Sequence, residues 1–182
     1  MTSFTKDPLL GAARILLIFF IALLGATAAL LVAAVPVLLI MRDSAIAQMA
    51  GEGIADGGAL ILPIVLVMLG VAGLLALAVW FLVLLRQIVN SVGEGDPFVP
   101  ANAVRLARMG WIALAGQLAS IPLAGMGLWL VELIAGRTKA DLHADMDGGL
   151  DFSGVLLVLV LFILARVFRQ GARMREELEG TV

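Results

Sequence analysis

An uncharged stretch in the middle of the chain decides the fold: residues Gly57 to Leu85 read GGALILPIVLVMLGVAGLLALAVWFLVLL. A helix needs about 20 apolar residues to cross a hydrocarbon core about 30 Å thick, and this stretch is longer than that. Uncharged stretches of comparable length cover residues 15–41 and 109–131. The first is about twice as long as the ~7–15 apolar residues of a signal peptide, so we expect it to be retained. The pattern predicts three membrane-spanning helices.

A fourth apolar stretch, residues 152–165, is too short to cross a membrane alone. Its extension to residues 148–168 is long enough, with Asp151 and Arg166 near the two interfaces, where charged side chains reach the headgroups. The whole chain is 62% hydrophobic and 14% charged, whereas a soluble domain has roughly 25% charged residues. We therefore predict an all-α, polytopic integral membrane protein, with residues 1–182 forming a single domain of four transmembrane helices.

The distribution of basic residues predicts the orientation of these spans. Lysine and arginine concentrate before the first span, between the second and third, and after the fourth, at Lys6, Arg14, Arg86, Arg105, Arg108, Arg166, Arg169, Arg173 and Arg175. The two other loops carry Arg42, Arg137 and Lys139. By the positive-inside rule, both termini are cytoplasmic, as are an elbow at residues 86–108 and a tail at residues 169–182.

Composition also bears on the classes of function. A net charge of −2 does not favour direct binding of nucleic acid. The absence of cysteine excludes disulfides, thiolate metal sites and cysteine nucleophiles. The outer-loop sequence ADLHADMDGGLD, residues 140–151, is rich in aspartate but does not fit a calcium-binding loop. When Gly148 is placed at the sixth position of such a loop, His143 stands where the first aspartate is required and Gly154 where the last glutamate is required. We interpret it as a solvated acidic loop, with a weak cation site as the alternative. We expect no metal site, no cofactor and no enzymatic activity.

The third span contains features that favour bending. Gln117, Pro122 and Gly125 lie between the aromatic residues Trp111 and Trp129. Proline frees a backbone carbonyl and glycine weakens a helix, so these three residues are a candidate hinge. A small-molecule transporter or channel component with its path along this span is the alternative function, and ordinary helix packing is the simpler interpretation of the same residues. Small residues at spacing four in the first two spans suit either packing within one chain or a homo-oligomer.

The elbow has the most specific local sequence, GEGDPFVPANAVRLARMGW, residues 93–111. Gly93 and Gly95 are predicted to end the second span, and Pro100 to begin a helix that runs without a break into the third. Spacing three places Asn102, Arg105 and Arg108 on one side of this helix. We expect these side chains to contact lipid headgroups or a protein partner.

The tail continues the fourth span as a helix with the sequence ARVFRQGARMREELEGTV, residues 165–182. Three of its four arginines, Arg166, Arg169 and Arg173, follow one side of the helix. This pattern is typical of a helix that lies at the membrane interface, or of a docking surface. Arg169 and Arg173 are therefore further candidates for binding a lipid headgroup or a partner.

The elbow and the tail together resemble a bacterial family of small four-span membrane proteins, the domain of unknown function 2975. The matching positions are Gly95, Pro97, Phe98, Asn102, Arg105, Leu106, Phe168, Gly171, Glu176 and Glu177. The resemblance implies a multi-pass protein of the bacterial cytoplasmic (inner) membrane and supplies no catalytic residue. It also implies a candidate partner, because relatives are often encoded beside a small helix-turn-helix regulator. Our leading hypothesis is a non-enzymatic membrane protein whose elbow and C-terminal helix bind such a regulator.

Overall fold

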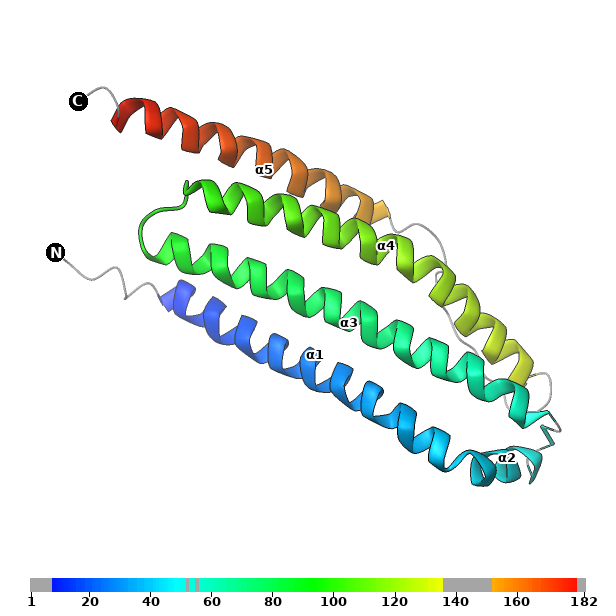
Figure 1. The fold of residues 1–182 in the computed structure, drawn as a ribbon. Coiled ribbons are helices and arrows are strands. Elements are labelled where there is room, and N and C mark those ends of the chain that lie inside the picture. Colours follow the sequence, from blue (N-terminus) through cyan, green and yellow to red (C-terminus); the bar gives the residue numbers. More distant parts are fainter. Residues whose placement is uncertain (1–7, 52, 55, 136–151, 180–182) are drawn as a thin grey trace. The chain divides into compact units, whose positions relative to one another are not determined.

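A computed structural model describes residues 8–51, 53–54, 56–135 and 152–179 of the chain. Within these ranges the structure consists of helices and contains no strand (Figure 1). The helices are α1 (Pro8–Ile40), α2 (Arg42–Gly51), α3 (Gly57–Gly93), α4 (Pro100–Ala135) and α5 (Phe152–Glu179). The predicted all-α fold class is therefore confirmed.

Four of these helices are long and apolar enough to cross a membrane. They include Leu10–Ile40, Gly57–Gly93, Pro100–Ile134 and Phe152–Glu177. The chain is thus a multi-pass membrane protein, as predicted, whereas the cytoplasmic location of its termini stays a prediction. The predicted start of the fourth span at Gly148 and the acidic outer loop with His143 lie outside the described residues.

The short helix α2 was not predicted from the sequence. It ends in a turn in which Gly53 has a positive φ of 91°. The amide of Gly53 donates to Ala50 and that of Ile54 donates to Met49, which is the hydrogen-bond pattern of a Schellman motif. Ile54 then lies buried, so the turn is held by apolar packing.

Helix α3 ends in the same backbone motif. Gly95 has a φ of 86°, its amide donates to Val92, and the amide of Asp96 donates to Ser91. The predictions that α3 ends at the glycines and that Pro100 begins an unbroken helix are both confirmed. Within the predicted elbow, residues 86–108, only residues 94–99 lie outside helices, so most of the elbow is helical.

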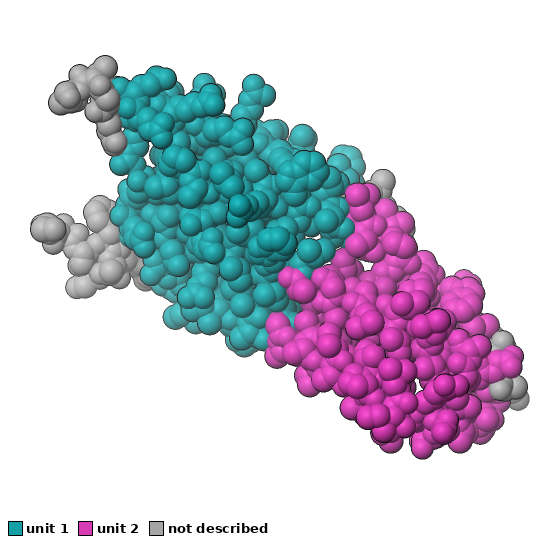
Figure 2. Space-filling view, in the orientation of Figure 1, with its two compact units in different colours: residues 1–24, 77–117, 151–182 teal, residues 25–76, 118–150 magenta. Residues whose placement is uncertain are grey.

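The chain forms two compact units, shown in different colours in Figure 2, and each has its own core. Unit 1 comprises residues 1–24, 77–117 and 151–182, and unit 2 comprises residues 25–76 and 118–150. The core of unit 1 joins α3, α4 and α5 through Leu84, Ile88, Leu106, Met109, Ile112, Leu161 and Ala165. The core of unit 2 contains Ile54, Leu60 and Leu130.

Candidate functional site

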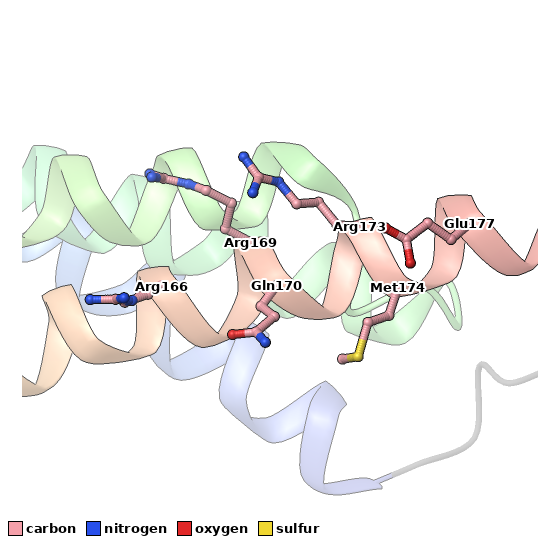
Figure 3. A pocket seen from close by; sticks show the side chains of 6 residues that line it. All are labelled: Arg166, Arg169, Gln170, Arg173, Met174 and Glu177. Atoms are coloured by element: carbon pink, nitrogen blue, oxygen red, sulfur yellow. The ribbon is translucent and has the colours of Figure 1, made fainter.

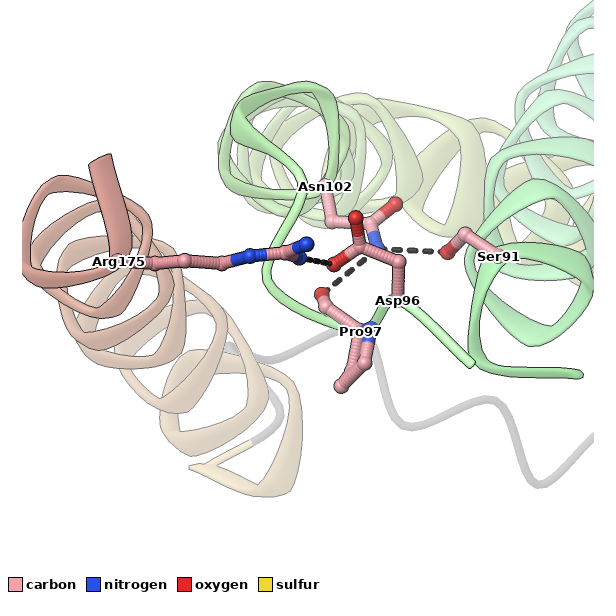
Figure 4. A network of polar contacts seen from close by, with 5 residues as sticks. All are labelled: Ser91, Asp96, Pro97, Asn102 and Arg175. Carbon is pink, nitrogen blue, oxygen red and sulfur yellow. Dashed lines mark hydrogen bonds and ion pairs between the residues drawn. The ribbon is translucent and has the colours of Figure 1, made fainter. Parts of the chain in front are cut away.

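The elbow is built around one buried polar side chain, Asn102, which is 0% exposed. Its Nδ2 donates to the hydroxyl of Ser91 at 2.6 Å and to the carbonyl of Pro97 at 2.9 Å (Figure 4). The Ser91 hydroxyl donates in turn to the carbonyl of Ile88 at 2.8 Å. A buried amide is costly unless it is hydrogen-bonded, and these bonds tie the end of α3 and the turn to the first residues of α4.

Arg105 extends this network to the surface of unit 1. Its Nη1 donates to Oδ1 of Asn102 at 2.7 Å, and its Nε donates to Oε1 of Gln87 at 3.0 Å. The guanidinium therefore connects α4 with α3. Because both bonds fix the side chain within the elbow, Arg105 serves the fold of this segment and is only half exposed.

The tail part of α5 docks on the turn between α3 and α4. The Phe98 and Phe168 rings lie 5.3 Å apart between centroids. Gly171 faces the Phe98 ring so closely that a Cβ added at Gly171 would lie 2.8 Å from Phe98 Cδ1. Asp96 and Arg175 form an ion pair across the same junction (Figure 4). The turn and the tail thus form one preassembled surface within unit 1.

Two groups of exposed side chains flank this junction. On α4, Ala101, Val104 and Arg108 follow one exposed side of the helix, and we call them the elbow face. Val104 is 47% exposed, although it is apolar. On α5, Arg166, Arg169 and Arg173 are all exposed, and we call them the arginine face.

The structure thus separates the residues singled out in the sequence. Arg108, Arg169 and Arg173 are exposed, whereas Asn102 is buried and Arg105 is half exposed. Asn102 is therefore not accessible to a partner or a headgroup in this structure. Ser91, Gln87, Asp96 and Arg175 belong to the same assembly and were missed, because their contacts join residues of different helices or of a turn and a helix.

The candidate hinge lies in a continuous helix. Helix α4 runs from Pro100 to Ala135 across Pro122 without interruption. The boundary between the two units falls in α4 directly after Gln117. The Gln117 side chain packs against α5 at Gly154, where an added Cβ would lie 2.9 Å from Gln117 Cδ. Bending at Gln117, Pro122 and Gly125, and transport along this span, stay predictions.

Acidic residues and histidine do not gather into a metal site within the described ranges. Among those residues, no group of three or more His, Cys, Asp or Glu side chains lies close enough to hold a metal ion. The outer-loop residues Asp141, His143, Asp145, Asp147 and Asp151 lie outside the described part of the chain.

A family model described as protein of unknown function (DUF2975) matches residues 43–182, which include α2 from its second residue, all of α3 to α5, and the whole elbow and tail. The chain belongs to this family. The first span, α1, precedes the matched residues, so the family likeness rests on the other four helices. No curated protein and no solved structure matched the chain.

Proposed function

We propose that this member of the DUF2975 family is a non-enzymatic membrane protein whose elbow face binds a cytosolic protein. The single observation that carries the proposal is an exposed side of α4, formed by Ala101, Val104 and Arg108, on an elbow that is otherwise fixed by buried contacts. A network of side-chain hydrogen bonds through Ser91, Asn102 and Arg105 lies here, outside the apolar stretches of the spans. The bacterial inner membrane is the location that we propose.

Preorganisation supports this proposal. A binding surface gains affinity when its backbone is fixed before the partner arrives, because less conformational entropy is lost on binding. The elbow is fixed by the Asn102 hydrogen bonds on one side and by the Phe98 contact with the tail on the other. Val104 supplies apolar area and Arg108 a charge, a combination that suits a partner with an acidic rim around an apolar contact.

The partner that we propose is a small helix-turn-helix regulator. This part of the proposal rests on the resemblance of the elbow and tail to proteins that are often encoded beside such regulators. Binding at the membrane would hold the regulator away from DNA. The protein itself then needs no nucleic-acid contact, in agreement with its net charge of −2.

Site-specific photocrosslinking in cells tests the proposal. A photoreactive residue at Val104 should capture a small helix-turn-helix protein, whereas the same probe at Leu118, which is 56% exposed on the same helix, should not. Arg108→Glu should lower the Val104 adduct roughly tenfold, because reversing one interface charge costs on the order of 1.4 kcal/mol or more. Equal capture at Val104 and Leu118, or capture at Val104 that Arg108→Glu does not change, would contradict binding of the partner at the elbow face.

A further inference from the structure

The arginine face lines a surface pocket on α5. Six side chains on one side of the helix border this open region of about 490 Å³, namely Arg166, Arg169, Gln170, Arg173, Met174 and Glu177 (Figure 3). Three of these six side chains are guanidinium groups, and Glu177 is the single acid among them. Figure 3 shows that Arg166, Arg169 and Arg173 all lean towards the N-terminal end of α5, the direction in which long helical side chains point. Their charges are therefore directed towards the apolar part of the helix.

The three guanidinium groups have capacity for a ligand. Within the described residues, the structure shows no hydrogen bond or ion pair that uses Arg166, Arg169 or Arg173. This distinguishes them from Arg105 and Arg175, whose guanidinium groups are bonded to side chains of the fold. Each arginine presents a planar set of donors that matches two oxygens of one phosphate group.

We infer that the arginine face binds the phosphate headgroup of an anionic membrane phospholipid. The chemistry of the face selects an anion. Guanidinium groups bind carboxylate and phosphate alike, but a phosphate group has more acceptor oxygens and can therefore accept from more than one arginine at the same time. Clusters of arginine and lysine directly beyond the cytoplasmic end of a membrane-spanning helix attract anionic lipid headgroups. The inference does not depend on the proposed protein partner, whose contacts lie on α4.

The position of the face along α5 favours a lipid over a soluble phosphate. The apolar part of α5 ends just before Arg166, and Ile163 and Val167 beside it are 55% and 54% exposed. From Arg166 to Arg173 the helix rises about 10 Å at about 1.5 Å per residue. That rise covers the headgroup layer, which adds roughly 5–7 Å to each side of the hydrocarbon core. An acyl chain can thus lie along Ile163 while its phosphate reaches the arginines.

Lipid retention by the purified full-length protein tests this inference. The protein is reconstituted in phosphatidylcholine nanodiscs that contain increasing amounts of phosphatidylglycerol, and the bound anionic lipid is counted by native mass spectrometry. At about fivefold per surface arginine, the triple variant Arg166→Gln, Arg169→Gln, Arg173→Gln should lose roughly 100-fold in apparent affinity for phosphatidylglycerol.

A matched pair of double variants separates a site from general surface charge. Arg42→Gln, Arg86→Gln removes charge from two exposed arginines outside the arginine face and the elbow face, and its lipid retention should stay within about twofold of the unmodified protein. Arg169→Gln, Arg173→Gln removes the same charge from the arginine face and should lose roughly 25-fold, at about fivefold per arginine. Equal losses in the two double variants, or no loss in the triple variant, would overturn the inference. Displacement of the lipid by millimolar inorganic phosphate would also overturn it, because the face would then serve a soluble anion.

Discussion

The turns that follow α2 and α3 have the same backbone geometry but are held by opposite kinds of contact. Each places a glycine in the left-handed region, Gly53 after α2 and Gly95 after α3, and each closes the Schellman pair of hydrogen bonds. After α2 the chain buries Ile54 against Leu60 and Leu130. After α3 it fixes the turn through the hydrogen bonds of Asn102.

This difference determines which side-chain substitutions each turn tolerates and how strictly the orientation of the turn is defined. Apolar packing is non-directional, so the turn after α2 accepts another side chain of similar volume. Hydrogen bonds specify both distance and angle, so the turn after α3 depends on one side chain with one donor and acceptor arrangement. The chain places the directional contacts at the elbow, where an exposed face has to be presented in a defined orientation.

Among the substitutions that test the contrast between the two turns, Asn102→Leu should lower the free energy of unfolding the most. It keeps the number and branching of the side-chain heavy atoms but leaves the Pro97 carbonyl and the buried Ser91 hydroxyl without their Asn102 contacts. We expect a loss of about 3 kcal/mol in the free energy of unfolding, because each buried polar group left unpaired costs about 1–3 kcal/mol. Unfolding in mixed detergent and dodecyl sulfate micelles, followed by circular dichroism, measures it. A loss below that of Ile54→Val would show that the hydrogen bonds are not what holds the elbow.

The paired substitutions Gly53→Ala and Gly95→Ala should each have an intermediate effect. An L-residue in the left-handed region costs roughly 1–2 kcal/mol at either position. A Cβ added at Gly95 would meet no other atom within 4 Å, so only the backbone conformation opposes it there. The two losses, measured in the same micelles, should therefore be similar. A much larger loss at Gly95 would mean that the polar network cannot adjust to backbone strain, which would sharpen the contrast between the turns.

The substitution Ile54→Val should have the smallest effect. It removes one methylene group from the apolar cluster with Leu60 and Leu130, so we expect a loss of about 1 kcal/mol. Thermal unfolding in detergent, with the unmodified protein as reference, measures it. If Ile54→Val were as damaging as Asn102→Leu, apolar packing would specify a turn as strictly as hydrogen bonding, and the comparison would fail.

Much of the fold was predictable because its signals are local. Long uncharged stretches predicted three spans, and a shorter one extended past Asp151 and Arg166 predicted the fourth. Gly93, Gly95 and Pro100 predicted where α3 ends and α4 begins. Helix α2 was missed because its sequence, RDSAIAQMAG, mixes polar and apolar residues outside the long uncharged stretches. The polar character of the elbow was also visible, since spacing three places Asn102, Arg105 and Arg108 on one side of a helix.

The roles of these three residues were not predictable from spacing. Which of them is buried depends on Ser91 and Pro97, which meet Asn102 only when α3 and α4 fold against each other. The contact between Asp96 and Arg175 joins a residue of the elbow to a residue of the tail 79 positions later, and no periodicity reports it. Exposure of Arg108, Arg169 and Arg173 likewise follows from tertiary packing, which periodicity alone cannot supply.

Helix α5 runs without interruption from Phe152 to Glu179, through its apolar part and its tail. At about 1.5 Å per residue it is a rod roughly 42 Å long. Because the helix is continuous, a rotation or shift of its C-terminal end near Glu177 also displaces Phe162. The Phe162 ring makes an edge-to-face contact with Trp111 of α4. Binding of a molecule to the tail can therefore change the packing of side chains in the apolar part of α5.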